Sequence, residues 1–179
     1  MPRHIAFLRA LNVGGQHMVR MDHLRRLFEK LGHAEVETFI ASGNVVFACA
    51  SKNARTLERA IAAHLEKELG YPVATFIRSP VELAAIGSYR AFSGKDAGAD
   101  SRLHVGFLSD KPAAAAVREL EGMKTGVDAF RVREREVYWS IRGGFSDSKF
   151  SGAKLEKLLG VQATFRNLNT VQKLAEKYT

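Results

Sequence analysis

A glycine-rich segment near residue 12 holds residue types that bind anions. Phe7-Leu8-Arg9-Ala10-Leu11-Asn12-Val13-Gly14-Gly15 is an apolar strand pattern that ends in Asn-x-Gly-Gly, and a helical pattern begins only at Met21. Glycine lets a backbone approach a ligand closely, and the free N–H groups of a following helix attract phosphate. The segment has neither the Lys-Ser/Thr of a P-loop nor the spacing of a dinucleotide fingerprint, so a turn that only needs glycine is the alternative. The candidate ligand-binding residues are Arg9, Asn12, Gly14, Gly15 and Arg20.

A second polar group, Ser42-Gly43-Asn44, separates two strand patterns as a three-residue hairpin loop. Ser42 and Asn44 could present a hydroxyl and an amide at the end of the sheet, beside the first loop, and both are candidate binding residues. A hairpin turn uses the same residues for geometry alone. No Gly-x-Ser-x-Gly surrounds Ser42, and no motif assigns it a histidine and an aspartate, so a serine hydrolase is poorly supported.

The second half of the chain has two comparable segments. Residues 142–151 bring glycines, hydroxyl groups and two cations in front of a helical pattern, where they could hold a phosphate. Further on, Asn169 and Gln172 match a capping box, which explains Asn169 without a ligand. An arginine and an asparagine just before them have no such local role, although an arginine commonly pairs with an acidic neighbour. The candidate binding residues here are Lys149, Arg166 and Asn167.

The chain offers no pattern for a metal, a cofactor or a membrane segment. The single Cys49 has no second cysteine for a disulfide, zinc or redox motif, and we expect a small buried hydrophobe. His4 and His17 lack partners at metal-ligand spacing. No apolar run reaches the ~18 residues of a membrane-spanning helix, and no signal-peptide core precedes the first strand pattern. We therefore predict a cytoplasmic protein with no metal, no cofactor and no membrane partner; its catalytic residues, if any, are unknown.

The composition favours acidic partners. The 179 residues are 46% hydrophobic, enough for one domain or two closely packed half-size units. Lysine and arginine number 27 against 19 acidic residues, and this net charge of +8 favours nucleotides, nucleic acid or phosphometabolites. No block of lysine and arginine concentrates the charge, so an ordinary solvated surface is the alternative.

Hydrophobic spacing predicts the same order of elements in both halves of the chain. Residues 1–89 indicate a strand at 3–10, a helix at 21–31, strands at 34–41 and 45–49, a helix at 53–69 and a strand at 72–78. A short helix then begins at Ser79-Pro80-Val81-Glu82, which matches a capping box with proline at the first helical position. Residues 90–101 lose periodicity and are predicted as a linker. Residues 102–179 indicate a strand at 102–108, a helix at 112–122, strands at 127–133 and 136–141, a helix at 151–159, a strand at 162–166 and a C-terminal helix at 170–178.

This βαββαβ order predicts an α+β fold with two ferredoxin-like repeats, each an antiparallel sheet with helices on one face and each followed by a short helix. Glu68–Phe76 resembles Leu158–Phe165, and we interpret the two halves as an internal duplication. Each repeat leaves one sheet face bare. Two repeats could cover these faces or join their sheets edge to edge, and the sequence does not choose between the arrangements.

An RNA-recognition module shares this order of elements and carries stacking aromatics on its two central strands. Phe7 and Phe47 fall on the corresponding strands. Residues 42–49, however, lack the Lys/Arg-Gly-aromatic octamer of that module. We therefore expect both phenylalanines to pack in the core or at the contact between the repeats.

Four blocks of the chain occur in a specific order and spacing: Phe7–Gly15, Val19-Arg20-Met21 with Leu24, Ser42–Phe47 and Thr164–Val171. Together they resemble the bacterial domain-of-unknown-function family 1697, and the resemblance covers essentially the whole chain. The chain departs from the family pattern at Leu168, where members usually have tryptophan. The resemblance implies a cytosolic protein with a duplicated ferredoxin-like architecture, and it brings no established activity or catalytic residues.

Three functions are compatible with these features. The leading hypothesis is a protein that binds a phosphate-bearing ligand, either a nucleotide or nucleic acid, through the glycine-rich loops and basic residues. The second is an enzyme on a small polar substrate that uses the cleft between the repeats. The third is a structural or assembly module whose bare sheet faces form a homodimer.

Overall fold

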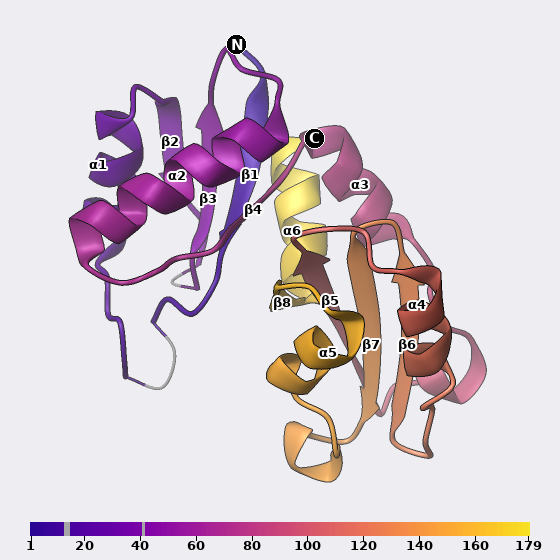
Figure 1. The fold of residues 1–179 in the computed structure, drawn as a ribbon. Helices are drawn as coiled ribbons and strands as arrows, with labels where there is room; N and C mark the ends of the chain where they lie inside the picture. The colour runs from indigo at the N-terminus through magenta and orange to yellow at the C-terminus, as the bar shows by residue number, and fades with distance from the viewer. Residues whose placement is uncertain (13–14, 41) are drawn as a thin grey trace. The chain divides into compact units, whose positions relative to one another are not determined.

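The computed structural model describes residues 1–12, 15–40 and 42–179. The chain forms two four-stranded antiparallel sheets with associated helices (Figure 1). Its internal contacts divide it into two units, which we call the first unit (Met1–Leu83 with Tyr178–Thr179) and the second unit (Ala84–Lys177). The predicted class, α+β with two ferredoxin-like sheet-helix repeats, is confirmed.

Both sheets have the same strand order relative to the chain. The first is ordered β2-β3-β1-β4 and the second β6-β7-β5-β8, with antiparallel neighbours throughout. The first sheet and its helices are β1 (Arg3–Leu8), α1 (Met21–Lys30), β2 (Ala34–Thr38), β3 (Asn44–Ala48), α2 (Ala54–Leu69) and β4 (Thr75–Arg78), followed by α3 (Pro80–Ser88). The later elements are η1 (Gly94–Ala97), β5 (Ser101–Leu108), α4 (Ala114–Glu121), β6 (Asp128–Arg133), β7 (Glu136–Arg142), η2 (Phe145–Asp147), α5 (Gly152–Leu159), β8 (Ala163–Asn167) and α6 (Leu168–Tyr178).

In the first unit, α1 and α2 each bury one apolar stripe. The buried apolar helix residues are Leu24, Leu27, Phe28, Leu57, Ile61 and Leu65. They share one core with Phe47 of β3. Both ends of α2 are capped, since the Asn53 side chain accepts from Thr56 N at 3.1 Å and Gly70 adopts a φ of 84°. Helix amphipathicity and local capping therefore agree in this unit.

The core of the second unit is built around Trp139 of β7, which is 2% exposed. Its Nε1 donates a hydrogen bond to Asp128 Oδ1 at 2.9 Å, so the only polar atom of the side chain is satisfied. Trp139 shares a cluster with Leu120 of α4 and Leu155 of α5. Helices α4 and α5 accordingly cover this face of the second sheet (Figure 1).

The opposite face of the second sheet meets the end of α3 and the start of α6. Tyr138 precedes Trp139 in β7 and therefore points to the other face. The Tyr138 hydroxyl donates to Ile86 O at 3.3 Å, and Gln172 Nε2 donates to Gly87 O at 3.0 Å. These contacts place the segment that leaves α3 beside the sheet.

Several local predictions can be compared with the structure. The capping box of α3 is confirmed, because Glu82 N donates to Ser79 Oγ at 3.2 Å and Ser79 N donates to Glu82 Oε2 at 2.7 Å. The strand predicted at 34–41 ends at Thr38. The predicted linker contains η1, a 3-10 helix. The repeat limits, 1–89 and 102–179, and the internal duplication stay predictions.

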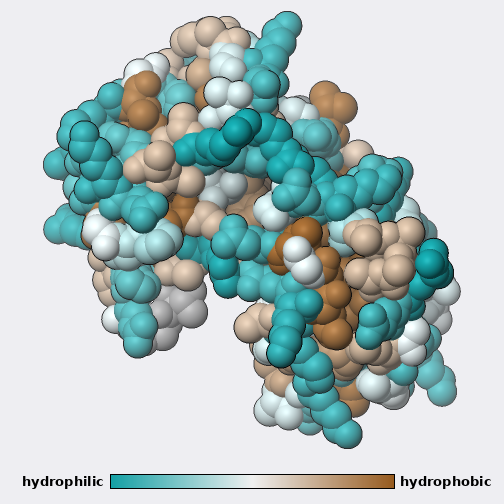
Figure 2. All heavy atoms as spheres, in the orientation of Figure 1, coloured by the Kyte–Doolittle hydropathy of each residue, from teal (hydrophilic) through white to brown (hydrophobic). Residues whose placement is uncertain are grey.

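The strand phenylalanines do not face solvent. Phe7 and Phe47 are both 0% exposed, and Phe47 lies in the core beneath α1 and α2, as expected. Figure 2 shows hydrophilic residues over most of the visible surface of both units. Within the part of the chain that the structure describes, no helix combines the length and apolar composition needed to cross a bilayer.

Candidate functional site

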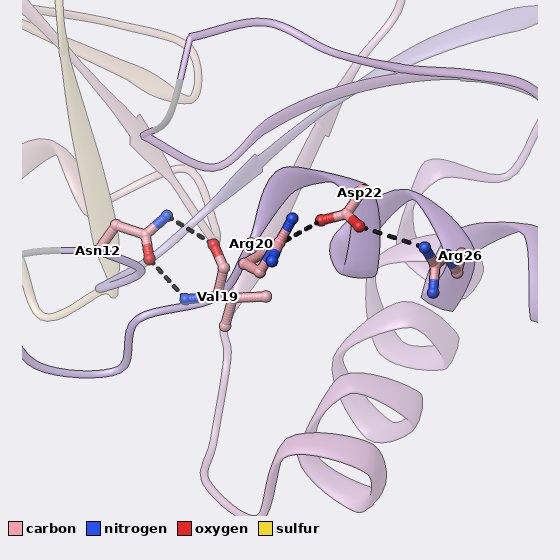
Figure 3. Close-up of polar contacts among 5 residues, drawn as sticks. All are labelled: Asn12, Val19, Arg20, Asp22 and Arg26. Atoms are coloured by element: carbon pink, nitrogen blue, oxygen red, sulfur yellow. Dashed lines mark hydrogen bonds and ion pairs between the residues drawn. The ribbon is translucent and has the colours of Figure 1, made fainter.

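The connection from β1 to α1 is held by the side chain of Asn12. Its Nδ2 donates to Val19 O at 3.1 Å, and Val19 N donates to its Oδ1 at 2.7 Å (Figure 3). The backbone of Asn12 also donates to His17 O at 3.3 Å and has a φ of 55°. Both ends of the amide are thus engaged with backbone, which matches the turn interpretation of this residue. Gly15 is exposed with a φ of 73°, and Gly14 lies outside the described residues.

Arg20 stands at the N-cap position of α1 and is engaged by an acidic neighbour. Its Nε lies 3.2 Å from Asp22 Oδ1, and Arg26 Nη2 lies 3.2 Å from the other carboxylate oxygen (Figure 3). Desolvation acts to raise the pKa of Asp22, but the charge and hydrogen bond of Arg20 and the charge of Arg26 outweigh it and lower that pKa. A carboxylate in the first turn competes with any anion for the helix N-terminus. This geometry weakens the case for a phosphate at α1.

The segment Ser42–Asn44 lies against the end of β1. The three-residue hairpin loop predicted at 42–44 is not confirmed, because β2 ends at Thr38 and Asn44 is the first residue of β3. Leu8 N donates to Gly43 O at 2.8 Å, and a Cβ on Gly43 would lie 3.2 Å from Leu8 O. Asn44 is fully buried, and its Nδ2 donates to Phe39 O at 2.9 Å and to Ser42 Oγ at 3.1 Å. The structure therefore brings the connection after β1 and the segment Ser42–Asn44 together. The side-chain amides of Asn12 and Asn44, however, form hydrogen bonds with backbone atoms. Arg9, half-buried at the start of the same loop, donates its backbone N–H to Ala74 O at 3.0 Å.

In the second unit, Arg166 is buried and Asn167 is a helix cap. Arg166 Nη1 donates to Thr164 Oγ1 and to Phe165 O, both at 2.9 Å, and burial lowers the pKa of its guanidinium to about 10. Asn167 Oδ1 accepts from Asn169 N at 2.9 Å, and α6 begins at Leu168. The predicted cap at Asn169 is therefore wrong, because the asparagine two residues earlier takes this position.

Lys149 is exposed in the connection between η2 and α5. Its carbonyl accepts a long hydrogen bond, 3.5 Å, from Lys154 Nζ. The N-terminus of α5 is capped by Ser151, whose hydroxyl accepts from Lys154 N at 3.2 Å. This capping serine uses one of the helix N–H groups that a phosphate would need.

A cavity of about 1000 Å³ in the second unit is lined by residues that were not among the predicted binding residues. Its wall is formed by the end of α3, the segment that follows it, η1, strands β5 to β7 and the start of α6. Ser140 Oγ donates to Asp96 O at 2.6 Å and fixes η1 beside the sheet. The cavity therefore lies on the same face of the second sheet as Tyr138, the face away from α4 and α5.

Cations outnumber acids in the lining of this cavity. Arg90, Lys124 and Arg131 line it, against the single carboxylate of Asp96. Lys124 Nζ lies 2.5 Å from Asp96 Oδ2, and Arg131 Nη1 lies 3.9 Å from Glu121 Oε2. Arg90 is exposed and has no ion-pair partner within the described ranges of the chain. The lining thus carries two more positive than negative groups, three against one.

Three aromatic side chains also line the cavity: Tyr89, Phe92 and Tyr138. The two tyrosine rings lie 5.0 Å apart, and the Arg133 guanidinium lies 4.4 Å from the Tyr89 ring centroid. Phe92 is half-buried and makes no ring contact with any residue that the structure describes. The sequence signal was present, because an arginine and a phenylalanine interrupt the small polar residues of the predicted linker.

Two histidines have a lowered pKa, one in each unit. His33 and His64 each have a buried Nε2 without a hydrogen-bond partner among the described residues. Burial, and then the charges of His4 and His64, lower the pKa of His33. In the second unit, burial is the main cause that lowers the pKa of His104. Among the residues described, no group of three or more histidine, cysteine, aspartate and glutamate side chains could hold a metal ion.

Comparisons with known proteins bear on family and fold. The model of a family described as "Protein of unknown function (DUF1697)" matches residues 1–138, which include three of the four sequence blocks. The structure of a conserved bacterial protein, SP0830 from Streptococcus pneumoniae, is similar with a TM-score of 0.75 and 21% identity, over 99% of each chain. No curated protein matches the chain. The structural similarity supports the fold alone.

Proposed function

The chain belongs to the DUF1697 family of proteins of unknown function, and we propose that it binds a phosphate-bearing ligand, a nucleotide or a nucleic acid. The observation that carries the proposal is the cavity of the second unit, whose lining includes three cationic side chains, Arg90, Lys124 and Arg131, and a single carboxylate. A surplus of cations in a concave site attracts anions, because the low-dielectric walls focus the field. The proposal places the protein in the cytoplasm.

The cations of the cavity can engage a phosphate at little cost to the fold. Arg131 is 51% exposed, and its pair with Glu121 is long, so its guanidinium can turn to a ligand. Lys124 keeps two ammonium hydrogens beyond the one that it directs at Asp96. Guanidinium groups bind phosphate oxygens through paired hydrogen bonds, which supply geometry as well as charge.

The glycine-rich loops remain a second location for the same ligand. One end of the first sheet has Arg9, Gly15 and Arg20 nearby. The guanidinium of Arg20, however, already forms an ion pair with Asp22. Lys149 is exposed, whereas Arg166 is buried and engaged with neighbouring oxygens. The cavity is therefore the more favourable location for the phosphate-bearing ligand, because its cations and aromatic rings converge on one volume.

The proposal is tested by titrating the protein with labelled single-stranded oligonucleotide and with a panel of nucleoside phosphates. Each titration is made at low and at moderate salt. We expect saturable binding that weakens as salt rises, because ions screen the cationic lining. Binding that is absent, or that does not respond to salt, would contradict the proposal.

A further inference from the structure

We infer that the cavity of the second unit takes a single nucleotide, whose base stacks on Phe92 and whose phosphates contact Arg90 and Arg131. This inference rests on the proposed function and names the ligand class of the same site. It assigns a role to the segment after α3, which the sequence presented only as a linker.

Four large aromatic side chains of the two sheets are buried and cannot stack against the bases of a nucleic-acid strand. RNA-binding modules with this order of elements stack bases on aromatic side chains of an open sheet face. Phe7, Phe47 and Phe107 are each 0% exposed, and Trp139 is 2% exposed. Among the described strand residues, these four rings therefore form no exposed row on which successive bases could stack. A ligand that needs only one aromatic platform fits the molecule better.

Phe92 is the aromatic side chain best placed to receive a base. The ring of Tyr89 already faces the Arg133 guanidinium, and the Tyr138 hydroxyl donates to Ile86 O. Phe92 is half-buried and lines the cavity without a ring contact to the described residues, so no neighbouring ring competes with a stacked base. Gln172 donates its amide nitrogen to Gly87 O, which leaves its carbonyl oxygen to accept from a base.

The cationic groups lie where they can reach the phosphates of the same ligand. Arg131 pairs in register with Tyr138 across β6 and β7, so the two side chains share one sheet face. Arg90 comes two residues after the end of α3 and lies two residues from Phe92. The base platform and the two guanidinium groups thus line one cavity. Its volume of about 1000 Å³ is at the upper end of small-molecule sites, about 300–1000 Å³, and holds a whole nucleotide.

The test compares nucleosides, nucleoside mono-, di- and triphosphates and a single-stranded oligonucleotide by calorimetry on the full chain. The variants are Phe92→Ala, Phe92→Tyr, Arg90→Ala and Arg131→Ala. Two matched controls are Arg118→Ala, an exposed arginine of α4, and Lys67→Ala, an exposed lysine of α2, neither of which lines the cavity. Thermal unfolding of each variant verifies that it is folded before binding is compared.

We expect affinity to rise from nucleoside to triphosphate. Phe92→Ala should weaken binding about five-fold or more, and Phe92→Tyr should retain it, because only the ring is needed. Arg90→Ala and Arg131→Ala should each weaken triphosphate binding about ten-fold, with a smaller loss for the monophosphate. The two controls should bind as the unmodified protein does.

The outcomes separate this inference from the proposed function. If neither nucleotides nor the oligonucleotide bind, the proposed function fails and the inference with it. If only the oligonucleotide binds, the inference fails while the proposed function stands. If nucleotides bind but the Phe92, Arg90 and Arg131 variants match the controls, the cavity is not the site and the inference is wrong.

Discussion

The two units share one strand order but use their polar side chains differently. In the first unit, Asn12 holds its own loop closed and Arg20 pairs with a neighbouring aspartate. In the second unit, Arg90 and Phe92 line a cavity without an ion-pair or ring partner among the residues described. The same strand order therefore supports two kinds of connection. In one, the polar side chains are paired within the connection, and in the other, polar and aromatic groups are available to a ligand. The difference lies in the connections and not in the strands.

One arginine in the last strand of each sheet, Arg78 in β4 and Arg166 in β8, shows what the two units have in common. Arg78 pairs with Ile5 and Arg166 pairs with Val105, so both hold the same place in their sheets. Each donates from Nη1 to the carbonyl of the residue before it, at 2.8 and 2.9 Å. A position shared by both units favours a structural role for Arg166, because only the second unit has the cavity described above.

The largest expected effect on the free energy of unfolding comes from truncating the central aromatic side chain of each core. Trp139 and Phe47 pair in register with His104 and His4, and each fills the core of its unit. Phe47→Ala and Trp139→Ala should each lower the free energy of unfolding by about 3–5 kcal/mol. Trp139→Ala should cost about 1 kcal/mol more, because it also removes one of the two donors to Asp128 Oδ1 and leaves only Ser148 Oγ. Urea unfolding followed by far-UV circular dichroism measures both; equal losses would remove this difference between the units.

A smaller effect tests whether the first loop is self-contained. Asn12→Ala removes both hydrogen bonds to Val19 and should lower the free energy of unfolding by about 1–3 kcal/mol. Nucleotide affinity should not change in the folded variant. A variant with unaltered stability and weaker binding would instead show that Asn12 contacts the ligand.

The pH dependence of stability should come from one histidine in each unit, His33 and His104. The folded-state pKa values of His33 and His104 lie below the ordinary value of 6.5, so the unfolded chain binds more protons between these values. Their contribution to stability is full above pH 6.5 and is lost as pH falls through the folded-state pKa. Urea midpoints should therefore be lower at about pH 5.5 than at pH 7.5. His33→Asn and His104→Asn should each reduce this dependence; a dependence that neither variant changes would rule out both histidines.

The smallest effect concerns the exposed pair at α1. Arg20→Ala should change the free energy of unfolding by at most about 1 kcal/mol, because the arginine side chain is 87% exposed. It should also leave nucleotide affinity unaltered, in contrast to Arg131→Ala. If Arg20→Ala weakened binding as strongly, the first unit would share the site and the contrast between the units would be lost.

Sequence similarity between the halves was informative only in part. The resemblance of Glu68–Phe76 to Leu158–Phe165 equates Thr75 with Thr164. The sheets pair Thr75 with Leu8 and Thr164 with Phe107, two positions that differ by one residue along the strand. A shift of one residue turns a side chain to the opposite face, so this similarity does not follow the sheet register. The matching strands His-Ile-Ala-Phe-Leu (4–8) and His-Val-Gly-Phe-Leu (104–108) do follow it.

The helices, the strands and their order could be predicted from the sequence, because apolar spacing and caps such as Gly70 and Ser79 act over a few residues. Local rules failed where neighbours compete, as when Asn167 rather than Asn169 capped α6. The cavity could not be predicted in this way. The segment with Arg90 and Phe92 lies far from Arg131 along the chain, and only the pairing of β6 with β7 and the contacts of α3 and α6 bring them to one volume. Local spacing thus determined the elements, while the convergence of distant side chains was decided by tertiary packing.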